Sequence, residues 1–149
     1  MKKSKKTNAV KGIFLLYCLL MFWLLLGQRM DSLDFLRDSG DARYNFVPLK
    51  TIRWYLELPK ITTDSYLLRH GYINLIGNIV MFIPLGLLLP KVCKPMKQFW
   101  TFLLSAIVGI VAMEVLQLLS GLGICDVDDL ILNLFGAMIG YLFYRIFTK

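Results

Sequence analysis

The sequence predicts an all-α integral membrane protein with about four transmembrane helices, both termini in the cytoplasm and one long outer loop. Three observations lead to this fold class. Hydrophobic residues make up 57% of the 149-residue chain and the mean hydropathy is +0.61, which is more apolar surface than a soluble chain of this size can bury. Four stretches have the apolar character of membrane spans, and the basic residues are unevenly divided among the segments that connect them. We expect a single domain over residues 1–149.

The first predicted span covers residues 12–27. It is shorter than the roughly 20 residues that cross a bilayer, but the long side chains of Lys11 and Arg29 at its ends can reach the membrane surface. A basic stretch before an apolar run is also typical of a secretory signal peptide. Because the following residues, LLLGQRMDS, offer no cleavage site of small residues, we interpret the segment as a retained span.

Three further spans are predicted at residues 72–90, 99–119 and 127–147. The first of these contains Pro84 and Gly86, which either kink the helix or are simply tolerated in it. The connection 28–71 is predicted as the outer loop. Its apolar and aromatic part, YNFVPLKTIRWYLEL, either lies on the membrane surface or folds back over the mouth of the bundle.

The orientation follows from lysine and arginine, which accumulate on the cytoplasmic side of membrane proteins. Outside the 28–71 connection, the basic residues fall at the N-terminus, between the second and third spans, and at the C-terminus: Lys2, Lys3, Lys5, Lys6, Lys11, Lys91, Lys94, Lys97, Arg145 and Lys149. With four spans, these three regions share one side. The net charge of +7 is therefore a topology signal, and no interleaving of basic and aromatic residues suggests a nucleic-acid partner.

The cysteines predict neither a metal site nor a disulfide framework. Cys18, Cys93 and Cys125 are odd in number and far apart, and no two of them have a metal-binding spacing. We expect no metal, and the sequence does not identify a cofactor.

Polar residues are concentrated near the outer ends of the last three predicted spans. Asn74 and Asn78 are four residues apart and share a helix face, and so do Glu114 and Gln117, which are three residues apart. The predicted orientation brings all of them to the depth of the outer leaflet. We therefore predict one ligand-binding polar cluster, formed by Asn74, Asn78, Glu114, Gln117, Asp126, Asp129 and Asn133.

A stripe along the last span combines polar and small residues. Asp129, Asn133, Gly136 and Gly140 follow helical spacing and so share one face. Gly136 and Gly140 form a GxxxG pattern, which permits close helix packing, so this face is predicted to point into the bundle. Asp129 and Asn133 are then expected to point inward as well.

The polar cluster has two interpretations. An ionised Glu114 facing lipid at mid-depth is unfavourable by roughly 2.5–3.5 kcal/mol, so it must meet water, a partner or a proton. Either the carboxylates and amides form a structural network, or they form a pocket for a ligand that opens outward or into the outer leaflet. We favour the pocket, because no span supplies a lysine or arginine to the carboxylates. Asp126 or Asp128 is also a candidate N-cap for the last span.

Three blocks of the sequence resemble the VanZ-like family of small membrane proteins. NFVPLKTI, residues 45–52, resembles the family's Asn-x-x-Pro-Phe/Leu segment, and NLIGNIVMFIPLGLLLP, residues 74–90, resembles its Asn-x-x-x-Asn-x-x-x-Phe-x-Pro-x-Gly block. EVLQLLSGLGICDVDDLILNLFGAMIGY, residues 114–141, resembles its Glu-x-x-Gln and Asp-x-x-Asp-x-x-x-Asn-x-x-Gly-x-x-x-Gly block. The positions carried by the resemblance are Asn74, Asn78, Pro84, Gly86, Glu114, Gln117, Asp126, Asp129, Asn133, Gly136 and Gly140.

One departure from the family pattern concerns charge. Many relatives have a basic residue before the Asp-x-x-Asp pair, whereas here that place falls on the uncharged Gly123 or its neighbour. This leaves Lys50, Arg53 and Arg69 of the outer connection as candidate counter-ions for the carboxylates.

The resemblance implies a role at the cell envelope. It links the chain to resistance against glycopeptide antibiotics of the teicoplanin type, which is attributed to the founding member, and it supplies no mechanism. We expect a multi-pass cell-membrane protein whose partners are the lipid bilayer and an extracytoplasmic lipid-linked or cationic envelope ligand. The alternatives are a membrane enzyme that uses Glu114 and Asp129 as an acid–base pair or as oxygen ligands for a divalent cation, and a small transporter.

Overall fold

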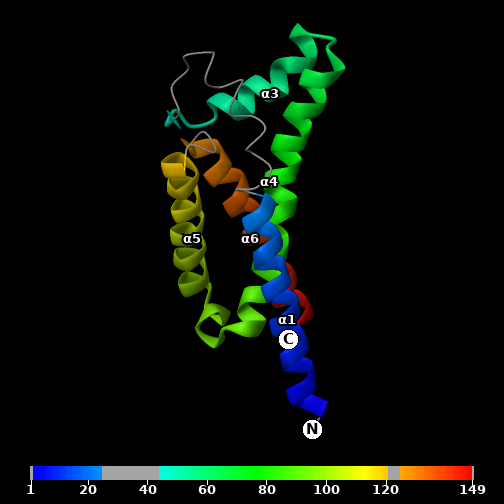
Figure 1. Cartoon of the computed structure of the whole chain (residues 1–149), viewed down its shortest axis with the longest axis vertical. Coiled ribbons are helices and arrows are strands. Elements are labelled where there is room, and N and C mark those ends of the chain that lie inside the picture. The colour runs from blue at the N-terminus through cyan, green and yellow to red at the C-terminus, as the bar shows by residue number, and fades with distance from the viewer. Residues whose placement is uncertain (1, 25–43, 121–124, 149) are drawn as a thin grey trace.

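The computed structural model describes residues 2–24, 44–120 and 125–148. Within these residues the chain is almost entirely helical (Figure 1). The elements in chain order are α1 (Lys2–Phe22), β1 (Tyr44–Asn45), α3 (Lys50–Ile61), α4 (Ser65–Val92), η3 (Lys94–Lys97), α5 (Phe99–Ser120), β2 (Cys125–Asp126) and α6 (Val127–Phe147). The two short strands pair in parallel, with Tyr44 opposite Cys125 and Asn45 opposite Asp126.

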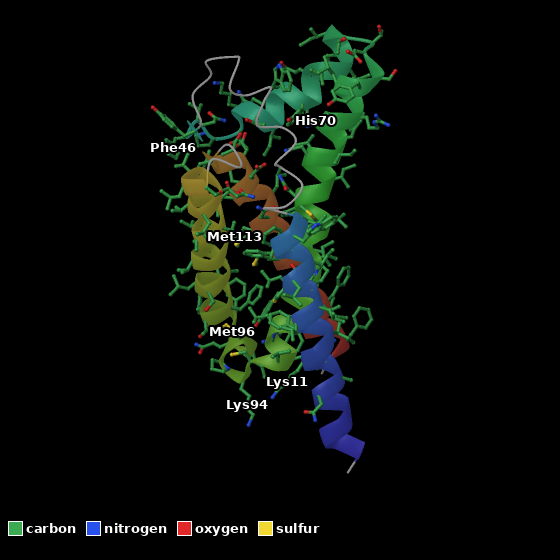
Figure 2. All side chains as sticks on the ribbon, in the orientation of Figure 1. Lys11, Phe46, His70, Lys94, Met96 and Met113 are labelled. Atoms are coloured by element: carbon green, nitrogen blue, oxygen red, sulfur yellow. The ribbon has the colours of Figure 1, made fainter. Side chains whose placement is uncertain are left out.

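The helices α1, α4, α5 and α6 run along the long axis of the molecule, and α3 lies across one end (Figure 1). We call this end the α3 end, and the opposite end, which carries the short turn from Lys94 to Lys97, the η3 end. Lys11 and Lys94 both lie at the η3 end, whereas His70 and Phe46 lie at the α3 end (Figure 2). The chain therefore rises in α1, descends in α4, rises in α5 and descends in α6.

The prediction of long apolar helices is confirmed for the last three. Helices α4, α5 and α6 are each long and apolar enough to cross a membrane. The bounds of α5 and α6 agree with the predicted spans 99–119 and 127–147 to within a residue. The helical part of the first predicted span is a shorter apolar stretch, Asn8–Phe22, and residues 25–27 of that span lie outside the described residues.

The connection 28–71 is not a loop throughout, in contrast to the prediction. It contains α3, and α4 begins at Ser65 rather than near residue 72. Helix α3 buries Leu58 and exposes Lys50, Arg53 and Lys60, so a search for long apolar runs does not detect it. The connection folds back over the bundle, where α3 contacts α4 and α6. Residues 28–43 lie outside the described part of the chain.

Helices α4 and α6 form the central pair, and glycine lets their backbones touch. A Cβ atom added at Gly136 would overlap the carbonyl oxygen of Ile79, and one added at Gly140 would overlap that of Ile83. On the facing helix, a Cβ at Gly86 would overlap the backbone carbonyl of Ala137. Helix α4 continues through Pro84 and Pro90 as one element.

A second part of the core is a group of aromatic side chains between α5 and α6 toward the η3 end. Phe102 is fully buried and stacks on Tyr141, with ring centroids 4.5 Å apart. The Tyr141 hydroxyl donates a hydrogen bond to the carbonyl of Lys97 at 2.7 Å, which ties α6 to the turn before α5. Helix α1 is attached in the same way, because the Tyr17 hydroxyl donates to the carbonyl of Met81 in α4 at 2.9 Å.

The outward faces of the long helices are apolar. Large hydrophobic side chains that are more than half exposed include Ile76, Val80, Leu104, Val108, Phe135 and Leu142. Such a continuous apolar exterior is unfavourable in water and is the surface expected of helices that lie in lipid.

Candidate functional site

The polar interior of the protein is confined to one region. Seven polar or charged side chains are buried in the described part of the chain: Asn78, Glu114, Gln117, Asp126, Asp128, Asp129 and Asn133. They come from the α3-end portions of α4, α5 and α6 and from β2, which directly precedes α6, and this places them at the end of the bundle where α3 lies (Figure 1). Asn74, the remaining predicted member, lies one turn from Asn78 on α4 and is half-buried. The structure therefore brings the predicted residues into one region of the bundle.

Asp126 caps the helix that it precedes. One carboxylate oxygen accepts a hydrogen bond from the backbone N–H of Asp128 at 2.9 Å, as expected of an N-cap residue. The carboxylate also accepts from the Thr51 hydroxyl at 2.5 Å and from the Asn45 side-chain amide at 3.2 Å. Asp126 thus joins the start of α6 to β1 and to the first turn of α3.

Asp128 caps a different helix, α3. Its side chain is completely buried and accepts hydrogen bonds from the backbone N–H groups of Leu49, Thr51 and Ile52 at 2.5, 2.8 and 3.0 Å. Helix α3 has no side-chain cap of its own at Leu49. The first N–H groups of a helix carry a partial positive charge, so they stabilise a buried carboxylate as well as being satisfied by it.

The same contacts fix an uncommon backbone conformation. Leu49 has φ 65°, in the left-handed region that β-carbon-bearing residues rarely adopt. The hydrogen bond from its N–H to Asp128, together with the helix that follows, holds the residue there. The N-terminus of α3 is therefore positioned by α6 and not by its own sequence.

Asp129 connects α6 to α4. It accepts a short hydrogen bond, 2.6 Å, from the side-chain amide of Asn78, and both residues are buried. On the same face of α6, Asp129 lies about two turns before Gly136 and about three turns before Gly140. The polar contact therefore extends the close α4–α6 interface toward the α3 end.

The amide oxygens of Asn74 and Asn133 accept no hydrogen bond from the residues that the structure describes. Both Oδ1 atoms are buried. Asn133 is 2% exposed and follows Asp129 by one turn, so its amide lies on the inward face of α6. Buried acceptors of this kind are uncommon in native proteins and call for an explanation.

Glu114 and Gln117 bring α5 into the cluster. Both are buried and lie one turn apart on the face of α5 that points into the bundle. Cys125, in β2, directly precedes Asp126, and β2 contacts α5. Burial, followed by the charges of Glu114, Asp126 and Asp129, raises the pKa of the Cys125 thiol.

The predicted counter-ions do not take that role among the described residues. Lys50, Arg53 and Arg69 are exposed, and within the described ranges none of them forms an ion pair with a cluster carboxylate. The partial positive charge at the N-terminus of α3 takes the place of a counter-ion for Asp128. The partner of Asp128 is therefore a set of backbone N–H groups. Every residue except proline has such a group, so the sequence does not single out these ones as the partner.

Three residues of the cluster were not among the predicted site residues: Asp128, Asn45 and Thr51. Asn45 and Thr51 fall in the NFVPLKTI block, so the family resemblance marked their segment without giving their contacts. For Asp128 the sequence indicates only a candidate N-cap of the last span. No group of three or more His, Cys, Asp or Glu side chains in the described ranges is arranged to hold a metal ion.

The fold and the cluster together define a class: a small all-α bundle with membrane-spanning helix lengths, an apolar exterior and a buried polar cluster at one end. The chain belongs to the VanZ/LLP1 family, whose sequence model matches residues 14–148. It is similar to Protein VanZ of Enterococcus faecium, with 23% identity over 139 residues that cover 93% of this chain and 75% of that protein. We found no solved structure with a significant match.

Proposed function

We propose that this chain is a multi-pass membrane protein of the cell envelope, with both termini in the cytoplasm and the α3 end facing outward. We further propose that the polar cluster under α3 binds an extracytoplasmic envelope component through a cationic or hydroxyl-bearing group. Membership of the VanZ/LLP1 family supports the envelope assignment. The resemblance to the founding member makes tolerance of teicoplanin-type antibiotics the first phenotype to measure.

The membrane assignment is supported by helix length and surface composition. Three helices are long enough to cross a bilayer, and their outward faces are apolar. The orientation is supported by Lys11 and Lys94, which share the η3 end (Figure 2). With the η3 end in the cytoplasm, the buried polar residues lie at the level of the outer leaflet.

The observation that carries the binding proposal is the pair of unsatisfied amide oxygens. A buried acceptor without a donor destabilises a fold by about 1–3 kcal/mol. A bound group with N–H or O–H donors would satisfy the Oδ1 atoms of Asn74 and Asn133. Asp129, which accepts from Asn78 and lies one turn before Asn133 on α6, brings a carboxylate to the same place. It favours a donor that is also positively charged, such as the ammonium of an amino sugar or of an aminoacylated headgroup.

The test separates binding from scaffolding by replacing Asn133 with leucine. If the cluster only holds the helices together, removing an unsatisfied buried acceptor should leave function and stability intact or raise stability. The proposal expects Asn133→Leu to reach normal membrane abundance but to fail to restore antibiotic tolerance to a deletion strain. Full restoration by Asn133→Leu would reject the binding role.

Two charge variants extend the test to α5 and α6. Glu114→Gln and Asp129→Asn keep the shape of each side chain and remove its charge. The binding proposal expects normal abundance and lost tolerance for both. Val108→Ala, on the exposed face of α5, is the matched control and should behave like the parent. Full tolerance in both amide variants would assign the carboxylates to scaffolding.

A further inference from the structure

The polar cluster is closed to solvent in this structure. Asn133, whose amide oxygen accepts no hydrogen bond from the described residues, is 2% exposed, and the carboxylate-bearing Asp129 is 5% exposed. A ligand can reach these side chains from outside only if part of the protein moves. The part that moves must be able to leave without separating the long helices of the bundle.

The three helices that form the cluster are packed too closely to separate. The backbones of α4 and α6 touch at Gly86, Gly136 and Gly140, and α6 buries nine of its 21 residues. Helix α5 is joined to α6 by the stacking of Phe102 on Tyr141. Pulling any of these helices away would leave closely packed surfaces without partners.

Helix α3 is attached by fewer apolar contacts. Within α3 only Leu58 is buried, and Tyr55 lies against Gly71 of α4, where an added Cβ atom would come within 2.6 Å of the ring. The helix lies across the end of the bundle that carries the cluster (Figure 1). Among the described helices at this end, α3 therefore loses the least buried surface when it moves.

Strand β1 and helix α3 form one unit. The side-chain amide of Asn45 donates a hydrogen bond to the hydroxyl of Thr51 at 3.0 Å, which closes the turn between the strand and the helix. This contact lies within the unit, so it is kept if the unit moves away from α6. We call residues 44–61 the lid. The lid continues into α4 through residues 62–64, which are not helical and in which Thr62 is extended, so this connection can act as a hinge.

Away from the hinge, polar contacts with Asp126 and Asp128 hold the lid. Asp128 accepts hydrogen bonds from three N–H groups at the start of α3, and Asp126 accepts from the side chains of Thr51 and Asn45. Water can replace such contacts at an end of the molecule. The closed lid also keeps Leu49 in the left-handed region, an unfavourable conformation that opening relieves.

We propose that the lid opens about residues 62–64 to admit the ligand to the polar cluster, and that Asp126 and Asp128 keep it closed. The proposal rests on the binding role proposed for the cluster, but its test measures access to the cluster and does not use the antibiotic phenotype. In this scheme Asp128 controls entry to the site, and Asn74, Asn133 and Asp129 meet the ligand.

The pairing of β1 with β2 offers a way to lock the lid. Tyr44 is exposed and lies directly opposite Cys125. Neighbouring strands are about 4.8 Å apart, which is within the Cα separation that a disulfide spans. In the full-length protein with Cys18→Ser and Cys93→Ser, the variant Tyr44→Cys should therefore form a disulfide with Cys125 on mild oxidation. Tyr44→Ser is the matched control without a disulfide.

Access is measured by placing Asn133→Cys in both proteins and labelling it with a membrane-impermeant maleimide that carries a trimethylammonium group. Peptide mass spectrometry follows this position alone. The oxidised Tyr44→Cys protein should label more slowly than the Tyr44→Ser protein by about tenfold or more, and reduction before labelling should restore the rate. Equal rates in the two proteins would overturn the proposal.

The same slowing is expected for N-ethylmaleimide, which also dissolves in lipid. If the disulfide leaves the rate with N-ethylmaleimide unchanged, entry is lateral, between the helices, and the lid is not the entrance. That result would overturn the proposal as well.

Asp128→Asn tests what keeps the lid closed. The variant keeps the shape of the side chain but weakens three hydrogen bonds, since bonds to a charged acceptor are roughly twice as strong as neutral ones. Labelling of Asn133→Cys should quicken about tenfold. Glu57→Gln removes an exposed carboxylate from the lid itself and should label like the parent.

A second reporter separates opening of the lid from loss of the fold. Ala106 is 2% exposed and belongs to the core around Phe102 and Tyr141. Labelling of Ala106→Cys should be slow and equal in the parent and in Asp128→Asn. If Asp128→Asn quickens labelling at both reporters alike, the bundle opens as a whole and the lid is not a separate unit, which overturns the proposal. Failure of the binding role would appear differently, as full antibiotic tolerance in Glu114→Gln and Asp129→Asn while the disulfide still controls labelling.

Discussion

Asp126 and Asp128 lie two residues apart and yet cap different helices. Asp126 caps α6, which follows it directly, whereas Asp128 caps α3, which lies far back in the sequence. The local role of Asp126 could be predicted, because an N-cap is recognised by its place before an apolar helix. The role of Asp128 could not, because its partners are the backbone N–H groups of Leu49, Thr51 and Ile52.

Replacing Asp128 with alanine should detach the N-terminus of α3. Three N–H groups lose a charged acceptor, so the free energy of unfolding should fall by about 2–4 kcal/mol. Reversible unfolding in mixed micelles measures this loss, and hydrogen exchange should quicken at Leu49, Thr51 and Ile52. Asp64→Ala is the control, because Asp64 is an exposed N-cap of α4 and its loss should cost only about 1 kcal/mol. Equal effects in the two variants would contradict the role given to Asp128.

Cys125 reports the charge of the cluster from its edge. Burial and then the charge of Glu114 raise the pKa of the Cys125 thiol, so the thiolate is scarcer at a given pH than in an ordinary cysteine. Glu114→Gln removes that charge and should lower the thiol pKa. In a Cys18→Ser, Cys93→Ser background, the pH profile of alkylation should shift to lower pH and the rate at fixed pH should rise. An unchanged profile would mean that Glu114 carries no charge in the folded protein.

At the scale of elements, the predictable parts are those with strong periodicity. Helices α5 and α6 were placed correctly because each is a long apolar run with a defined start. Helix α3 was not predicted as a helix, because it is short and amphipathic and its N-cap comes from another element. The stripe of Gly136 and Gly140 gave the packing face of α6, but the matching Gly86 on α4 became meaningful only when the two helices were seen together.

The α4–α6 contact should be intolerant of even one added carbon. Gly140→Ala places a Cβ against the carbonyl of Ile83, so the two helices must separate and stability should fall by about 1–3 kcal/mol. Gly77→Ala adds the same carbon to open space on α4 and should be neutral or slightly stabilising. Thermal unfolding in detergent distinguishes the two, and equal stability would mean that the helices are not packed backbone to backbone.

At the scale of the whole molecule, the positions of lysine and arginine in the sequence predict the orientation of the bundle in the membrane. The structure shows which residues lie at each end of the bundle. Lys11 and Lys94 come from distant parts of the chain and lie at the same end (Figure 2). The polar cluster lies at the other end. The sequence predicts that the basic residues and the polar cluster are on opposite sides, and the structure places them at opposite ends. The position of α3 above the cluster could not be predicted, because the segment was equally suited to the membrane surface.

Labelling of single cysteines tests the orientation in intact cells. In a background without native cysteines, Lys94→Cys should resist a membrane-impermeant maleimide, because the proposed orientation puts the η3 end in the cytoplasm. Asp64→Cys, at the α3 end, should react. Permeabilised cells supply the control, since both positions are exposed and should then react. Labelling of Lys94→Cys from outside would reverse the orientation and place the cluster in the inner leaflet.

The cap that Asp128 provides has a consequence for biosynthesis. Ribosomes deliver α3 well before α6, so the N-terminus of α3 waits without its acceptor until the segment carrying Asp128 has been made and inserted. The contact that holds α3 over the cluster is therefore completed late, because Asp128 is synthesised after α4 and α5. A nascent chain interrupted before α6 lacks both this cap on α3 and the partner of Asn78, so the buried polar cluster forms only in the complete bundle.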